Sequence, residues 1–142
     1  MLQNKRGDIY AWVAALMLFI AAPLASLSID IVRMMYVRGH LHTATDAACQ
    51  AAVNTLDVSH FTTTGEARVD RGRGRTNAVN VFRANLVDAD TVRYTESLVV
   101  DFPGPRLAHC TSTAQVDHLI PMTPTMNVVV ETTSEMRGSY GN

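Results

Sequence analysis

The sequence has little net charge and no excess of basic residues. Its 12 lysine and arginine residues nearly balance 13 acidic residues, the formal net charge is −1, and charged residues make up 18% of the chain. Nucleic-acid-binding proteins usually carry a basic surplus, so this balance predicts no nucleic-acid partner. Disorder is excluded for a different reason, because 47% of the residues are hydrophobic and can bury enough apolar surface to fold.

The sequence also lacks the motifs that mark catalytic or cofactor sites. It contains no glycine-rich phosphate loop, nucleophile elbow or zinc-ligand spacing. His40 and His42 are two residues apart in a segment with helical spacing, so they point to different faces. His109 and Cys110 are neighbours in a strand-like segment and point to opposite sides. We therefore predict a protein without enzymatic activity, metal or cofactor.

Cysteine occurs only twice, as Cys49 and Cys110. In an oxidising compartment the two could form a disulfide that closes a long loop and stabilises the fold by about 4 kcal/mol. Two buried free thiols fit the sequence equally well, because the geometry of the pair cannot be derived from its spacing.

The longest uncharged stretch runs for 21 residues, from Ile9 to Ile29. As a helix rising about 1.5 Å per residue it covers the roughly 30 Å hydrocarbon core of a bilayer. A cleaved secretory signal is the alternative, but its apolar core is usually about 7–15 residues, and here helical spacing continues through Asp30. We predict a polar segment over 1–8 and a retained single-pass helix over 9–29. Lys5 and Arg6 favour a cytoplasmic N-terminus, with the rest of the chain outside the cytoplasm.

The helical pattern continues as an amphipathic extension over 30–56. Small apolar residues recur there at steps of 4, 3, 4 and 3, which is the spacing of a helix-packing seam: Val37, Leu41, Ala44, Ala48 and Ala51. Thr45 is expected on another face, with the polar residues. The seam packs either on the chain's own C-terminal part or on a neighbouring copy or partner helix.

An acidic and a basic residue meet the end of the apolar stretch. Asp30 and Arg33 lie three residues apart, on one face of the predicted helix, and can pair with each other. Ionisable groups this close to hydrocarbon are costly unless paired or placed at the interface. The pair either ends the membrane span or docks a partner helix.

Several of these residues together resemble a known family. The order Arg6-Gly7, Ile29-Asp30, Arg33, Leu41 and the run over 45–48 is similar to the N-terminal signature of the TadE/TadG-like proteins. These belong to the assembly system of the Flp, or tight-adherence, pilus, a type IV-like pilus. The resemblance covers roughly the first third of the chain. It is loose in the remainder, where only the layout of a helix followed by strands is shared.

The resemblance implies a non-enzymatic pilin-like subunit or pilus-assembly protein in the cytoplasmic membrane or a cell-surface pilus. Its partners would be the membrane and other pilin-like subunits, bound through the N-terminal helix. Prepilin-like members are cut after a glycine and carry a glutamate five residues into the mature chain. Gly7–Asp8 is the matching junction here, with Trp12 at the fifth position. The alternatives are the main repeated subunit of a filament, and a secreted binding module with a cleaved signal.

The C-terminal part, 57–142, shows the patterns of a small extracytoplasmic α+β domain. A polar connector over 57–75, with a solvated arginine run, is followed by a short helix from a cap at Thr76 to Leu86. Alternating patterns then predict three strands, over 91–102 with a bulge or break near Glu96, over 107–118 and over 125–136. The predicted fold class is α+β, with a long N-terminal helix packed on a small antiparallel sheet, as in pilins.

Overall fold

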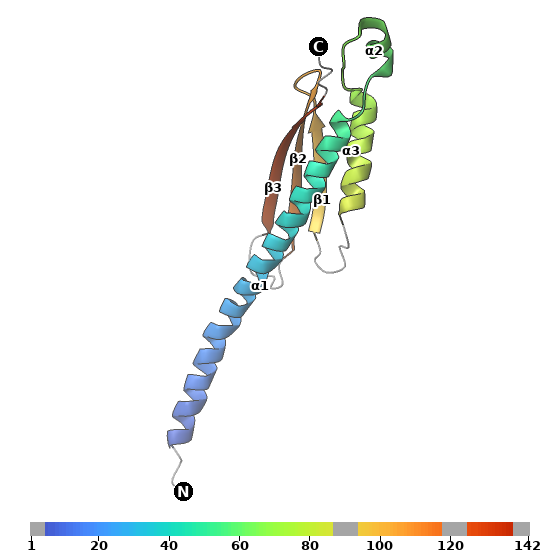
Figure 1. The fold of residues 1–142 in the computed structure, drawn as a ribbon. Helices are drawn as coiled ribbons and strands as arrows, with labels where there is room; N and C mark the ends of the chain where they lie inside the picture. The colour runs from blue at the N-terminus through green and yellow to red at the C-terminus, as the bar shows by residue number, and fades with distance from the viewer. Residues whose placement is uncertain (1–4, 87–93, 118–124, 138–142) are drawn as a thin grey trace.

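The protein is described by a computed structural model that covers residues 5–86, 94–117 and 125–137. It is an α+β fold in which one long helix packs against a small antiparallel sheet, as predicted (Figure 1). The elements in chain order are α1 (Lys5–Val53), α2 (Val58–Thr64), α3 (Arg71–Asn85), β1 (Tyr94–Asp101), β2 (Leu107–Val116) and β3 (Met126–Glu135).

Helix α1 is one uninterrupted helix of 49 residues. At about 1.5 Å per residue it is roughly 73 Å long, far longer than the sheet that it contacts. It ends at Val53, three residues before the predicted end at Leu56, and Pro23 lies inside it without ending it. The two predicted helical segments are therefore parts of one rod, and in Figure 1 the lower part extends well beyond the other elements.

The three strands form one sheet in the order β1-β2-β3, with both neighbouring pairs antiparallel. The predicted period of two is confirmed, because Val100, Cys110, Val128 and Val130 all lie on the buried face. The predicted bulge or break near Glu96 is wrong, since the β1–β2 register runs continuously and places Glu96 opposite Ala114. The polar side chain at this position stays exposed near the end of an edge strand and leaves the pairing intact.

The segment predicted as a polar connector contains two helix starts that aspartates cap. Asp57 accepts a hydrogen bond from the backbone N–H of His60 at 3.1 Å and begins α2. Asp70 accepts from Gly72 N–H at 3.0 Å and Arg73 N–H at 3.1 Å and begins α3. The predicted cap at Thr76 is thus wrong by six positions. The alternating Arg-Gly run concealed the start of α3, because glycine has a low helix propensity, about 1 kcal/mol below alanine.

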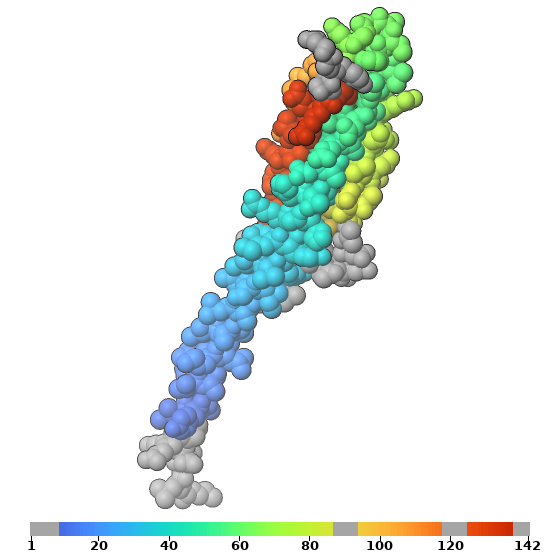
Figure 2. Space-filling view, viewed as in Figure 1, coloured from blue at the N-terminus to red at the C-terminus, as the bar shows by residue number. Residues whose placement is uncertain are grey.

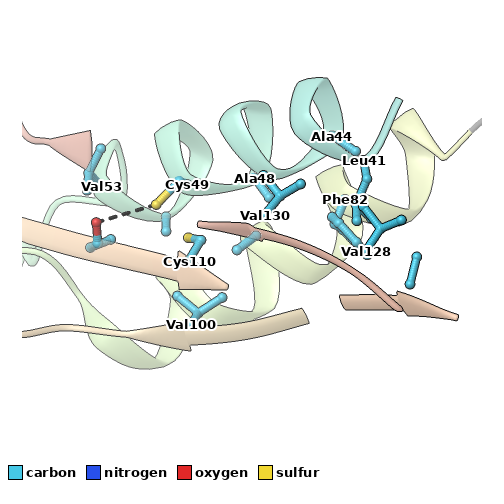
Figure 3. Packing of buried hydrophobic residues seen from close by; sticks show 14 of the residues in the cluster. Leu41, Ala44, Ala48, Cys49, Val53, Phe82, Val100, Cys110, Val128 and Val130 are labelled. Atoms are coloured by element: carbon cyan, nitrogen blue, oxygen red, sulfur yellow. Dashed lines mark hydrogen bonds between the residues drawn. The ribbon is translucent and has the colours of Figure 1, made fainter. Parts of the chain in front are cut away.

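The core lies between the upper half of α1, the inner face of the sheet and α3. Figure 3 shows Leu41, Ala44, Ala48 and Cys49 pointing from α1 toward the sheet residues Cys110, Val128 and Val130. Phe82 of α3 belongs to the same cluster and lies near Leu41 and Val128. Apolar contacts of this kind dominate the stability of small domains, so the sheet and α3 hold the upper half of α1 in place.

Candidate functional site

The lower part of α1, Ile9–Ile29, is apolar and exposed, and we call it the anchor half. Its large side chains are largely exposed, including Trp12 at 75% and Phe19 at 81%. Only 6% of the most apolar 18-residue window of α1 is buried inside the fold. A core helix of a soluble protein would be mostly buried instead. The helix is long and apolar enough to cross a membrane, and Figure 2 shows this half standing clear of the rest of the chain.

The upper part, Asp30–Val53, carries the predicted seam, and we call it the packed half. Val37, Leu41, Ala44 and Ala48 are all at most 1% exposed and face the chain's own sheet and α3. The last predicted member needs a correction, because Ala51 is only partly buried and Ala52 takes the position on the buried face. Of the two readings of the seam, packing on the chain's own domain is the one that this fold uses.

Asp30 and Arg33 lie at the junction of the two halves. The Arg33 Nη1 and Asp30 Oδ1 atoms are 3.7 Å apart, and the two side chains are 20% and 8% exposed. Asp30 lies seven residues before Val37, on the same face as the seam. Arg33 Nη1 is buried and has no hydrogen-bond partner within the described residues. The pair therefore faces the side of the chain's own domain. On the other faces of α1, exposed apolar side chains continue past it to Tyr36.

A buried pair of hydroxyl groups connects the packed half to the centre of the sheet. Thr45 is fully buried in the core, which corrects the expectation that it lies on another face. Its Oγ1 donates to the Leu41 carbonyl at 2.6 Å, so the Ser112 hydroxyl, also 2.6 Å away, donates to Thr45. Sequence patterning missed this contact because both residues are polar, yet each occupies an apolar face. Buried hydroxyl groups require such partners, and this pair fixes one register between helix and strand.

The two cysteines meet in the core as free thiols and are not bonded to each other. Cys49 Sγ donates to the Ala108 carbonyl at 3.4 Å (Figure 3, dashed line). The hydrogen bond with Cys49 and burial raise the pKa of the Cys110 thiol. Cys110 therefore stays protonated at neutral pH, whereas the same hydrogen bond lowers the pKa of Cys49. Both thiols are fully buried, so neither is accessible as a reactive cysteine is.

The other predicted site residues lie apart from these contacts. Gly7 and Asp8, the candidate processing junction, are inside the first turns of α1. Within the described ranges no three His, Cys, Asp or Glu side chains gather closely enough to hold a metal ion. A polar groove of about 610 Å³ lies along the contact between α1 and β3. Its lining residues include Asp46, Asn54 and Glu135.

In this arrangement one continuous helix joins an exposed apolar surface at one end to a small packed domain at the other. Comparison of the chain with protein-family profiles, with curated proteins and with solved structures gives no match.

Proposed function

We propose that this protein is a pilin-like subunit or assembly protein of a tight-adherence pilus, without enzymatic activity and anchored in the cytoplasmic membrane by α1. The observation that carries the proposal is the continuity of α1, whose anchor half is exposed while its packed half is built into the domain. Because no joint separates the halves, the helix sets the position of the domain relative to the membrane. The order of residues shared with the TadE/TadG-like signature supports the same function.

The anchor half also leaves an interface for other subunits. Within Ile9–Ile29 every side chain is exposed except Ser26, which is partly exposed. Such a span can be surrounded by lipid or by the spans of neighbouring subunits, because a helix satisfies its own backbone hydrogen bonds in either setting. This uniform exposure favours a second candidate as well, the main repeated subunit of a filament. In that case the same surface is buried among identical helices.

The deciding experiment is the intact mass of the native protein, taken separately from membranes and from sheared surface material. A full-length mass found only in membranes supports an assembly protein with a retained anchor. A mass that begins at Asp8, recovered from sheared fibres, identifies a processed filament subunit. A soluble species that begins near Ser26 would overturn both and leave a secreted domain.

A pair of matched variants tests the anchor directly. Leu16→Arg/Ile20→Arg places two charges near the middle of the span, at a cost of about 5–7 kcal/mol for insertion, or roughly 3 kcal/mol each. Val99→Arg, on the open face of β1, replaces a side chain that is 54% exposed, close to the 50% of Ile20. We expect the double variant to become extractable from membranes at alkaline pH and the Val99 variant to stay in them. Equal retention of both would show that the anchor half does not span the bilayer.

A further inference from the structure

We propose that copies of this protein pack side by side through oppositely charged flanks, the outer stripe of α3 of one copy against the β3 flank of the next. The inference rests on the proposed function, because it requires copies anchored in parallel in one membrane. We define the outer α3 stripe as Arg73, Thr76, Asn80 and Arg83, and the β3 flank as the exposed side chains of β3, namely Asn127, Val129, Glu131, Thr133 and Glu135.

The two flanks lie on opposite sides of the packed half of α1. Figures 1 and 2 show α3 on one side of α1 and β3 on the other. The outer α3 stripe recurs at steps of 3, 4 and 3, on the face opposite the buried Gly74, Ala78 and Phe82. All four of its members are exposed. A contact between these flanks uses different surfaces on the two copies, so it repeats into rings or open helical arrays.

The charges on the two flanks are complementary. Helix α3 contains no acidic residue, and its outer stripe presents Arg73 and Arg83. The β3 flank presents Glu131 and Glu135, and β3 itself contains no basic residue. The exposed Arg137 follows Glu135 by two residues and lines the same groove, so the acidic character is strongest at Glu131. Arg73 has only a loose internal pair, with its Nε atom 3.8 Å from Asp70 Oδ2, and exposed pairs of this kind contribute little. When two copies meet flank to flank, the arginines of one copy can form ion pairs with the glutamates of the other. These pairs replace charges that are solvated and weakly paired in the single copy.

The spacing and height of the charges also match. Arg73 and Arg83 are ten helical residues apart, about 15 Å, and Glu131 and Glu135 are four strand residues apart, about 13 Å. Gly74 lies against Ala52 of α1, and Glu135 lines the groove with Val53 and Asn54. Arg73 and Glu135 are thus at the same level along α1. Both charged rows then extend toward the membrane end, because α3 runs down the packed half and β3 runs up it (Figure 1).

The backbone edge of β3 lies next to this flank, roughly at right angles to its exposed side chains. Met136 N–H donates to the Arg106 carbonyl at 2.8 Å, which extends the β2–β3 register and shows that even-numbered residues of β3 bond to β2. The N–H and C=O groups of its odd-numbered residues therefore point away from β2. The opposite edge differs, because Arg75 Nη2 of α3 donates to the Val100 carbonyl of β1 at 3.2 Å. Within the described residues no strand pairs with the outer edge of β3, so this edge can accept the polar side chains of α3.

Paired cysteine variants test this geometry in the full-length protein in membranes. Asn80→Cys and Thr133→Cys are placed in separate copies, co-expressed and treated with a bis-maleimide. The native Cys49 and Cys110 are fully buried and do not compete. We expect a crosslinked dimer only when both variants are present. Dimers joined 80 to 80 or 133 to 133, or no dimer in the mixture, would overturn the proposal.

Charge reversal tests the cause of the contact. We expect the crosslink yield to fall more than about tenfold in each of two double variants, Arg73→Glu/Arg83→Glu and Glu131→Arg/Glu135→Arg. Combining all four substitutions in one chain should restore the yield. Glu66→Arg/Glu96→Arg changes the net charge equally at exposed positions away from both flanks and should leave the yield unchanged. Equal losses in this control, or no rescue, would contradict flank pairing. Crosslinks without fibres would refute the second candidate function, the repeated subunit of a filament, and leave this packing in place. Fibres without crosslinks would refute this packing and leave that candidate in place.

Discussion

Gly74 allows α3 to approach the end of α1 closely, and its replacement by alanine is expected to destabilise the domain. A Cβ atom at Gly74 would lie 2.8 Å from the backbone oxygen of Ala52 and 3.3 Å from Phe102 Cζ. The first neighbour is backbone of α1 and cannot rotate away, so one helix must shift. Overpacking of this kind typically costs about 1–3 kcal/mol. The higher helix propensity of alanine offsets up to about 1 kcal/mol of this cost, which leaves a net loss of up to about 2 kcal/mol.

Gly72 provides the matched control in the same helix. Its added Cβ atom would meet only Asp70 Oδ1, at 3.5 Å, which is an ordinary contact. Gly72→Ala should therefore keep or slightly raise stability, while Gly74→Ala lowers it. Urea unfolding of the full chain in detergent, followed by far-UV circular dichroism, measures both. With a slope of about 2 kcal/mol per molar urea, the Gly74→Ala midpoint should fall by up to about 1 M. A Gly74→Ala midpoint at or above that of the wild type would refute the close approach of the two helices.

Three further results are expected. Thr45→Val should lower the free energy of unfolding by about 1–3 kcal/mol, measured with urea, because the buried Ser112 hydroxyl loses its acceptor. Adding Ser112→Ala should recover part of that loss. Strict additivity of the two single effects would contradict the pairing. In native protein neither Cys49 nor Cys110 should react with maleimide, and denaturation should expose two reactive thiols; a denatured mass without adducts would show a disulfide instead. Bonds from Ser59 and Arg68 lower the pKa of Asp57, so its contribution is present above the ordinary value of 3.8 and is lost as pH falls below it. The urea midpoints of wild type and Asp57→Asn should therefore differ most above about pH 5 and converge in acid; a difference that is constant with pH would contradict the ion pair with Arg68.

The parts of the fold that were predictable have a strict hydrophobic period. The strand segments alternate apolar and polar residues, and the structure places Cys110, Val128 and Val130 inward as that alternation requires. The seam residues Val37 to Ala48 follow the helical period and are buried as a group. The anchor half was predicted from the length of its uncharged stretch alone, because the thickness of a bilayer sets the number of residues that a membrane span needs.

The parts that were missed depend on single contacts that periodicity does not encode. Two aspartate caps define α2 and α3, but helix propensity around them is poor, so the sequence of this region resembles a loop. Thr45 and Ser112 occupy core positions as a pair, and each alone is a polar residue that averages assign to the surface. The small size of Gly74 matters only because Ala52 lies opposite it. The contacts of Thr45 with Ser112 and of Gly74 with Ala52 join residues distant in sequence, so no local pattern can reveal them. The two caps are local, and only the poor helix propensity of the residues that follow concealed them.

The division of α1 into two halves connects the fold to the proposed role. The packed half buries its seam against its own domain, and its exposed large apolar side chains, Ile31, Val32, Met35 and Tyr36, lie in its first two turns. The anchor half, in contrast, exposes apolar side chains along its whole length. In the proposed role, a partner helix binds the apolar surface of the anchor half and of these first two turns, and contacts between the domains farther from the membrane are mainly polar. The charged flanks on α3 and β3 are polar contacts of this kind. Salt should therefore weaken association between the domains, because exposed charge pairs are screened at high ionic strength, while association between the anchor halves should be insensitive to salt.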